Sequence, residues 1–109
     1  MKQPTPPKSI LQESHELIHG ARRTDYGPAH QSFTQIATLW TALLATKLTS
    51  KITATEVALL MQQLKVARLI HQPAHYDSIL DNVSYGALVK TVQDAEASGD
   101  ELPGILGQL

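Results

Sequence analysis

Residues 54–91 read ATEVALLMQQLKVARLIHQPAHYDSILDNVSYGALVKT, and this stretch decides the fold. Its first half spaces apolar residues as the buried face of a helix does, at Val57, Leu60, Met61, Leu64 and Ile70. Pro73 requires that this helix has already ended, because proline disfavours a helical conformation in the residue before it. A second helix is predicted after the break QPAHYDS.

Charged residues stand in both of these helices. Lys65 and Arg68 follow Leu64 within the apolar pattern, while Asp77 and Asp81 are four residues apart and therefore project from one face of the next helix. Tyr85 lies one further turn along that face. We therefore expect two cations and two carboxylates to converge on one cavity.

Two further helices are predicted before this stretch. Ser9 and Gln12 form a capping box that opens a helix reaching about residue 21, and Thr53 with Glu56 forms another at the start of the central helix. Residues 29–48 show helical spacing of Phe33, Ile36, Ala37, Trp40, Leu43 and Leu44. The last helix is expected to run to about residue 97, with Asp77 or Ser78 as its cap. The sequence thus predicts an all-α, four-helix bundle-like single domain.

Length and composition narrow the class of protein. The chain has 109 residues, no cysteine and a formal net charge of −1, which favours one domain and argues against extended nucleic-acid binding. Residues 1–8 are expected to form an extended arm, 9–97 the helical domain and 98–109 a tail. We expect a soluble cytoplasmic protein without membrane contact. The apolar central helix and tail favour a homodimer or larger oligomer.

Two interpretations of the charged residues stand side by side. In the first, Asp77 and Asp81 hold Mg²⁺ with Glu56 as third ligand, and Lys65 and Arg68 neutralise phosphate oxygens. In the second, the aspartates only cap the helix, where the helix dipole stabilises their negative charge, and the basic residues pair with them in a structural salt-bridge network.

A second polar group precedes the helix that begins at residue 29. Arg22, Asp25 and Tyr26 stand in a turn that either reaches the same cavity and binds ligand or only fixes the connection between helices. His75, beside Asp77, is either a ligand-binding residue or an anchor of its loop.

The stretches GARRTDYGPAHQSFTQIATLW, EVALLMQQLKVARL and HYDSILDNVSYGAL together resemble a family of small phage and prophage proteins of uncharacterised function. The family pattern is Arg-x-x-Asp-Tyr-Gly, Ile-Ala-x-Leu-Trp, Lys-x-Ala-Arg and His-x-Asp-x-x-x-Asp, and the likeness covers most of residues 10–90. It implies functional positions at Arg22, Asp25, Tyr26, Lys65, Arg68, His75, Asp77, Asp81 and Tyr85. One departure is Ala21, where the pattern leads us to expect an acidic residue.

The helical arrangement is more remotely similar to the all-α nucleoside triphosphate pyrophosphohydrolases of the MazG and dUTPase kind. Those enzymes hold Mg²⁺ through Glu-x-x-Glu on one helix and Glu-x-x-Asp on the next. Glu56 and Asp81 stand at comparable places, but Leu59 and Ser78 replace the other two acids. The resemblance implies nucleotide handling more strongly than it implies hydrolysis.

The leading hypothesis is a phage-type nucleotide-handling protein that binds a nucleotide or related phosphorylated metabolite, with Mg²⁺-dependent hydrolysis of a nucleoside triphosphate as its enzymatic form. The alternative is a non-catalytic module that binds a nucleotide or a host protein as a counter-defence or regulatory factor.

Overall fold

A computed structural model describes residues 8–20 and 28–99, and every regular element in these residues is helical. The elements are α1 (Ile10–His19), α3 (Ala29–Leu44), the short 3₁₀ helix η1 (Ala45–Lys47), α4 (Ala54–His71) and α5 (Tyr76–Ser98). The prediction of an all-α single domain is confirmed. Of the arm expected over residues 1–8 and the tail expected over residues 98–109, residues 1–7 and 100–109 lie outside the described residues, and Ser98 belongs to α5.

Both predicted capping boxes are present. The Ser9 hydroxyl accepts the Gln12 backbone N–H while the Gln12 side chain accepts the Ser9 N–H, and Thr53 and Glu56 do the same at the start of α4. Each box satisfies two backbone donors that the first helical turn leaves without partners. The local sequence therefore determines where α1 and α4 begin.

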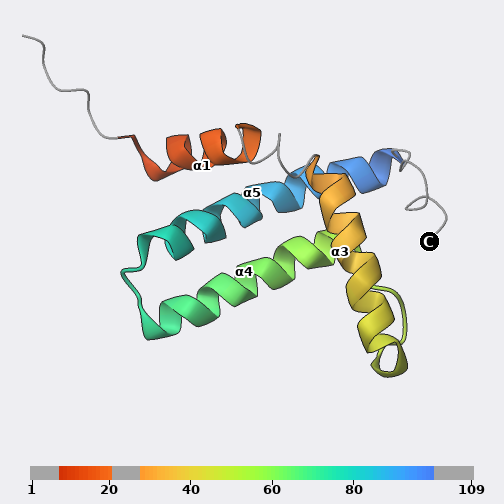
Figure 1. The fold of residues 1–109 in the computed structure, drawn as a ribbon. Coiled ribbons are helices and arrows are strands. Elements are labelled where there is room, and N and C mark those ends of the chain that lie inside the picture. Colours follow the sequence, from red (N-terminus) through yellow and green to blue (C-terminus); the bar gives the residue numbers. More distant parts are fainter. Residues whose placement is uncertain (1–7, 21–27, 100–109) are drawn as a thin grey trace, which may run out of the picture.

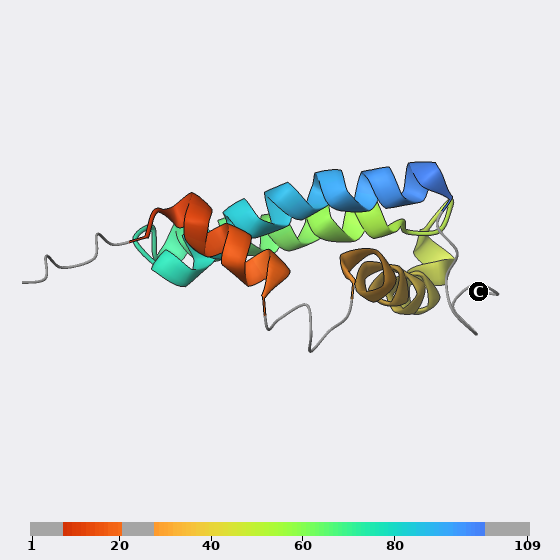
Figure 2. The same ribbon diagram turned by 90° about the horizontal axis from the view of Figure 1, so that it is seen from above.

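The scaffold is an antiparallel hairpin of α4 and α5, which lie side by side along most of their length (Figure 1). Helix α3 crosses this hairpin steeply at the end away from the α4–α5 turn, and α1 lies along the first half of α5. Figure 2 shows the same arrangement from above, with α4 and α5 stacked and α3 seen nearly end-on. The α4–α5 turn is therefore near α1 and remote from α3.

The core lies where α3, α4 and α5 meet, and small residues let these helices approach closely. Its buried members are Ala29, Phe33, Ala37, Ala54, Val57, Ala58, Leu88 and Val92. Ile18 of α1 packs against this cluster from the partly buried shell. The buried apolar residues of the described chain thus lie mainly where α3 crosses the hairpin.

The predicted buried face of α4 is correct only in part. Val57 is fully buried and Met61 packs on the core, but Leu60, Leu64 and Ile70 are 45%, 54% and 74% exposed. Helix α4 is apolar on nearly all sides, so its spacing alone does not identify which side packs against α5. Leu43 near the end of α3 is likewise 81% exposed rather than inward-facing.

Two close contacts fix how the helices pack. The buried hydroxyls of Ser14 on α1 and Ser84 on α5 are 2.8 Å apart, and Ser84 Oγ donates to the Leu80 carbonyl at 2.9 Å. A Cβ atom added at Gly86 would lie 2.9 Å from Nε2 of Gln62, so the glycine makes room for that side chain. Helices α4 and α5 therefore pack closely at Gly86.

Candidate functional site

An ion pair joins the two hairpin helices on the side where the sequence predicts a charged site. Lys65 Nζ of α4 lies 3.1 Å from Asp81 Oδ2 of α5, and both side chains are only 17% exposed. Water screens such a pair far less than it screens a surface pair. The contact that the salt-bridge interpretation requires is therefore present.

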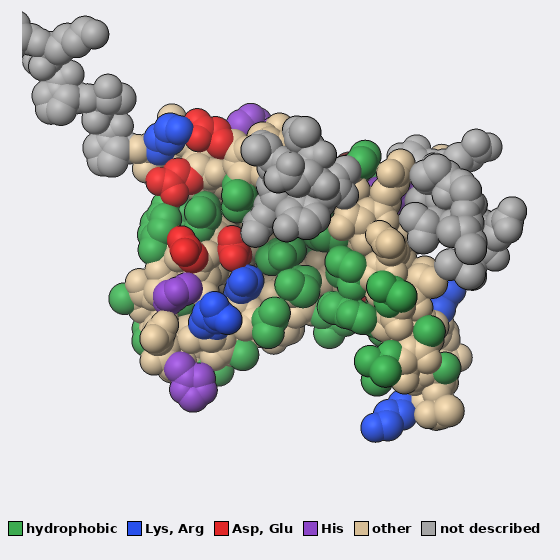
Figure 3. All heavy atoms as spheres, in the orientation of Figure 1, with side chains coloured by type: hydrophobic (Ala, Val, Ile, Leu, Met, Phe, Trp, Pro, Cys, Tyr) green, Lys and Arg blue, Asp and Glu red, His purple; other side chains and the backbone are tan. Residues whose placement is uncertain are grey.

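The other two charged residues lie nearer the α4–α5 turn. Arg68 is one turn beyond Lys65, and Asp77 is one turn before Asp81 on the antiparallel helix, so the residues occupy successive levels of the hairpin. Arg68 and Asp77 are both exposed, and no ion pair joins them within the described parts of the chain. We refer to Lys65, Arg68, Asp77 and Asp81 as the charged cluster. Figure 3 shows acidic, basic and histidine side chains gathered on this end of the molecule.

The start of α5 is capped by His75, not by Asp77 or Ser78 as predicted. His75 Nδ1 accepts the Ser78 backbone N–H at 3.3 Å and lies 2.7 Å from the Ser78 hydroxyl. Ser78 is 1% exposed, so this bond also satisfies a buried hydroxyl group. The loop-anchor interpretation of His75 has direct geometric support, and the carboxylate of Asp77 is left free of a capping role.

A hydrogen bond ties α1 to the first residue of α5, and sequence reasoning missed it. The Tyr76 hydroxyl donates to Glu13 Oε2 at 2.6 Å, and this bond raises the pKa of the Tyr76 phenol because the neutral form is the donor. Glu16, also on α1, accepts a hydrogen bond from Lys8, which precedes the helix, and this bond raises the pKa of the Lys8 ammonium. Tyr76 and Glu13 are 63 positions apart in the chain, and no local pattern marks such a contact.

Tyr85, another predicted ligand-binding residue, lies toward the core. It packs against the buried cluster, and its ring centroid is 6.2 Å from that of Phe33 on α3. This is a usual separation for a packed aromatic pair. The Tyr85 ring therefore contributes to packing between α3 and α5.

The structure does not bring the three predicted metal ligands together. Glu56 belongs to the first turn of α4, where neighbouring Thr55 bonds the Glu96 carboxylate near the end of α5. Asp81 contacts α4 at Lys65, about 14 Å further along the helix axis. Within residues 8–20 and 28–99 no group of three metal-ligating side chains is assembled.

The second polar group of the prediction cannot be positioned against this site. Arg22, Asp25 and Tyr26, together with Ala21, lie outside the described residues. Their predicted role as ligand-binding residues stays a prediction. In the part of the chain that is described, no helix is long and apolar enough to cross a membrane.

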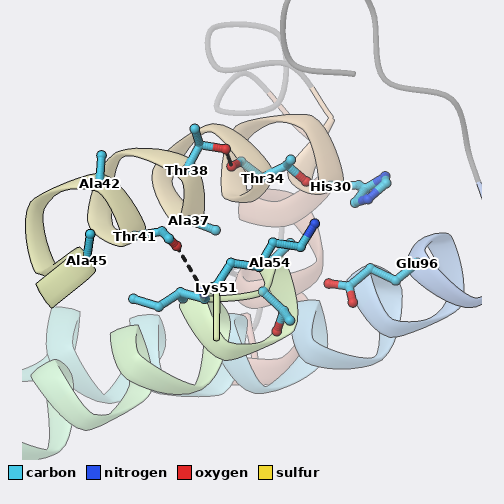
Figure 4. Close-up of a pocket in the computed structure, with 12 residues that line it drawn as sticks. His30, Thr34, Ala37, Thr38, Thr41, Ala42, Ala45, Lys51, Ala54 and Glu96 are labelled. Carbon is cyan, nitrogen blue, oxygen red and sulfur yellow. Dashed lines mark hydrogen bonds between the residues drawn. The ribbon is translucent and has the colours of Figure 1, made fainter. Parts of the chain in front are cut away.

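A separate pocket of about 440 Å³ lies at the opposite end of the hairpin, and sequence reasoning did not predict it. One face of α3 lines it with alanines and threonines, including Thr34 and Thr41, and the segment before α4 closes one side (Figure 4). Lys51, His30 and Glu96 supply its ionisable groups. A run of small residues on one helix face was the available signal, because such residues leave space between helices unfilled.

Comparison with known proteins finds one domain family and phage proteins similar to this chain. Residues 9–93 match the family described as Domain of unknown function (DUF6378). The chain is 36% identical over 85 residues to the Gene 55 protein of Mycobacterium phage L5, covering 78% of this chain and 53% of that protein. It is 33% identical over 93 residues to the Gene 55 protein of Mycobacterium phage D29, covering 85% and 59% respectively. The chain thus spans little more than half the length of these curated relatives, and no solved structure matches it significantly.

Proposed function

We propose that this chain, which belongs to the DUF6378 family, binds a nucleotide or a related phosphorylated metabolite at the charged cluster. Its phage relatives agree with the phage protein family that the sequence motifs predicted. The observation that carries the proposal is the placing of two cations one turn apart on α4, with only one of them in an ion pair among the described residues.

Arg68 is the main phosphate-binding residue in this proposal. Its guanidinium group is exposed and makes no hydrogen bond or ion pair within the described ranges 8–20 and 28–99. A guanidinium group presents paired donors that match two oxygens of a phosphate. Lys65 is fixed beside it by Asp81, so one cation is held in place and the other is available to a ligand.

Mg²⁺ enters the proposal through Asp77 and Asp81. These carboxylates are one turn apart on α5, and Mg²⁺ is usually held by one or two carboxylates together with water and substrate phosphates. A bound metal would supply Lewis-acid activation of a phosphoryl group, as the likeness to MazG-type pyrophosphohydrolases implies. The role of the protein residues is then to orient the phosphates through Arg68 and Lys65.

Binding without hydrolysis is the second candidate, and the position of Glu56 favours it. Glu56 lies at the end of α4 remote from the aspartates, so this part of the chain offers two carboxylates where the MazG-type enzymes use four. In this form the protein is a nucleotide- or host-protein-binding module. Where the bound partner is a nucleotide, the two candidates differ only in turnover.

Calorimetry with a panel of nucleoside mono-, di- and triphosphates, with and without Mg²⁺, tests binding directly. We expect Arg68→Ala to weaken binding about tenfold or more, because a hydrogen bond to a charged group contributes about 1.5–3 kcal/mol. Lys90→Ala is the matched control, since it also removes one exposed cation from the hairpin but its partner Asp94 lies on α5 away from the cluster. An equal loss in both variants would contradict the proposed site.

Pyrophosphate or phosphate release from the same samples separates the two candidates. Release that depends on Mg²⁺ and is lost in Asp81→Asn supports the enzyme, whereas binding without release supports the module. If a metal supplies positive charge between the aspartates, Mg²⁺ should also raise the melting temperature of the unmodified chain and not that of Asp81→Asn. Failure of every nucleotide to bind would refute nucleotide binding in both the catalytic and the non-catalytic form.

A further inference from the structure

The side of α4 that faces away from α5 carries almost no polar groups. Leu59, Leu60, Leu64, Val66 and Ile70 are 46%, 45%, 54%, 40% and 74% exposed, and we call these residues the α4 stripe. Exposed Ala67 lies among them, and Gln63 is the one polar residue on this side between Glu56 and His71. Hydrophobic side chains are visible along α4 and toward its crossing with α3 (Figure 3).

Solvent-facing sides of helices in single-chain proteins are normally charged or polar, and contiguous apolar patches of a few hundred Å² mark binding surfaces. The stripe extends over three turns of α4. Packing among residues 8–20 and 28–99 does not explain its composition, because α5 and α3 cover the opposite side, where Val57 and Ala58 are fully buried. The described part of the chain therefore leaves the stripe uncovered.

We propose that a second copy of the chain covers the α4 stripe, with the two α4 helices antiparallel about a two-fold axis near Gln63 and Leu64. The stripe begins at Leu59 and ends at Ile70, so its midpoint falls just after Leu64, about 2 Å along the helix from Gln63. A two-fold axis there places Leu59 of each copy opposite the partner's Ile70. Each copy then contributes the same residues to the interface, as two-fold symmetry requires.

The charges at the two ends of α4 select the antiparallel orientation. The first turn of α4 carries Glu56, and its last turn carries Arg68 and His71. In the antiparallel pair the acidic first turn of each copy lies beside the basic last turn of its partner. A parallel pair would place Glu56 beside the partner's Glu56, and like charges at an interface are unfavourable.

The composition of the surface also fits a second copy. A stable interface buries about 800 Å² on each partner around a mainly apolar centre. Three apolar turns supply such a centre, and Gln63 at the midpoint can donate and accept with its own copy through the side-chain amide. The flanking polar residues of α4 then form the rim.

Cysteine cross-linking tests the arrangement cleanly, because the chain has no cysteine. Gln63→Cys lies about 2 Å along the helix from the axis, closer to its own copy than either end of the stripe, so we expect it to form a disulfide-linked dimer on mild oxidation. Leu59→Cys and Ile70→Cys each lie about 16 Å along the helix from their own copies and should not cross-link alone. A mixture of these two variants should cross-link as a heterodimer. Equal self-cross-linking at all three positions would indicate parallel helices and overturn the antiparallel arrangement.

Light scattering of the full 109-residue chain tests the dimer itself. We expect twice the chain mass, and the mass of one chain for Leu60→Lys/Leu64→Lys with helical content unchanged by circular dichroism. Leu43→Lys on α3 is the control, since that side chain is 81% exposed outside the stripe and the variant should stay dimeric. A monomeric parent chain, or a dimer that survives the double substitution, would overturn the proposal. Because neither readout needs a nucleotide, its failure is separate from failure of the proposed function.

Discussion

Replacing Lys65 by methionine should destabilise the hairpin by about 2 kcal/mol. The change keeps a long apolar side chain and removes the cation that lies 3.1 Å from Asp81. Breaking a fully buried pair costs about 3–5 kcal/mol, and breaking an exposed one costs about 0–1 kcal/mol. With both side chains 17% exposed, the Lys65–Asp81 pair lies between these limits.

A double-mutant cycle isolates the pair from the other contacts of each residue. Urea unfolding followed by circular dichroism gives the free energy of unfolding for Lys65→Met, Asp81→Asn and the double variant. We expect the double variant to lose at least about 1 kcal/mol less than the sum of the two single losses. Additive losses would mean that the two charges do not stabilise each other.

An exposed ion pair within α5 provides the control. Lys90 and Asp94 are 2.7 Å apart, but their side chains are 78% and 61% exposed. Lys90→Met should therefore cost less than about 0.5 kcal/mol. A loss for Lys65→Met no greater than the loss for Lys90→Met would refute the argument from burial.

Three other substitutions test the fold around the charged cluster. Gly86→Ala should change the free energy of unfolding by less than about 0.5 kcal/mol, because its better helix propensity is offset by displacement of the Gln62 side chain. In a Gln62→Ala background the same change should stabilise the chain by about 1 kcal/mol, and urea unfolding checks both values. His75→Ala should cost about 1 kcal/mol in the same assay through loss of the α5 cap, and an unchanged value would contradict that role. The hydrogen bond to Glu13 raises the pKa of Tyr76, so its stabilisation is present below the ordinary pKa of 10.0 and is lost as pH rises through the higher folded-state value. The stability difference between the parent chain and Tyr76→Phe should thus be constant at neutral pH and disappear at strongly alkaline pH.

The helices and two of their starting points could be predicted because their signals are local. Ser9 with Gln12 and Thr53 with Glu56 each need only four consecutive residues, and the structure contains both boxes. The cap of α5 was predicted wrongly because Asp77 has the higher intrinsic preference for such positions. The backbone enters α5 two residues earlier than a cap at Asp77 would require, which gives the role to His75.

Which sides of the helices pack together could not be predicted in the same way. Leu60 and Leu64 are as apolar as Val57, so the sequence of α4 is compatible with burial of either side. The decision depends on contacts with α3 and α5 that are distant in sequence. The same limit applies to the site, because the antiparallel hairpin separates Glu56 from Asp81 although spacing alone allowed them to meet.

The hydrogen bond between the Ser14 and Ser84 hydroxyls matters more to α1 than to α5. Ser84 has one hydroxyl hydrogen, and its bond to the Leu80 carbonyl uses it, so Ser14 must be the donor in the contact between the two serines. If α1 moves away, Ser84 keeps its own acceptor, whereas Ser14 must find water. At this contact α1 therefore depends on α5 for its hydrogen bonding more than α5 depends on α1.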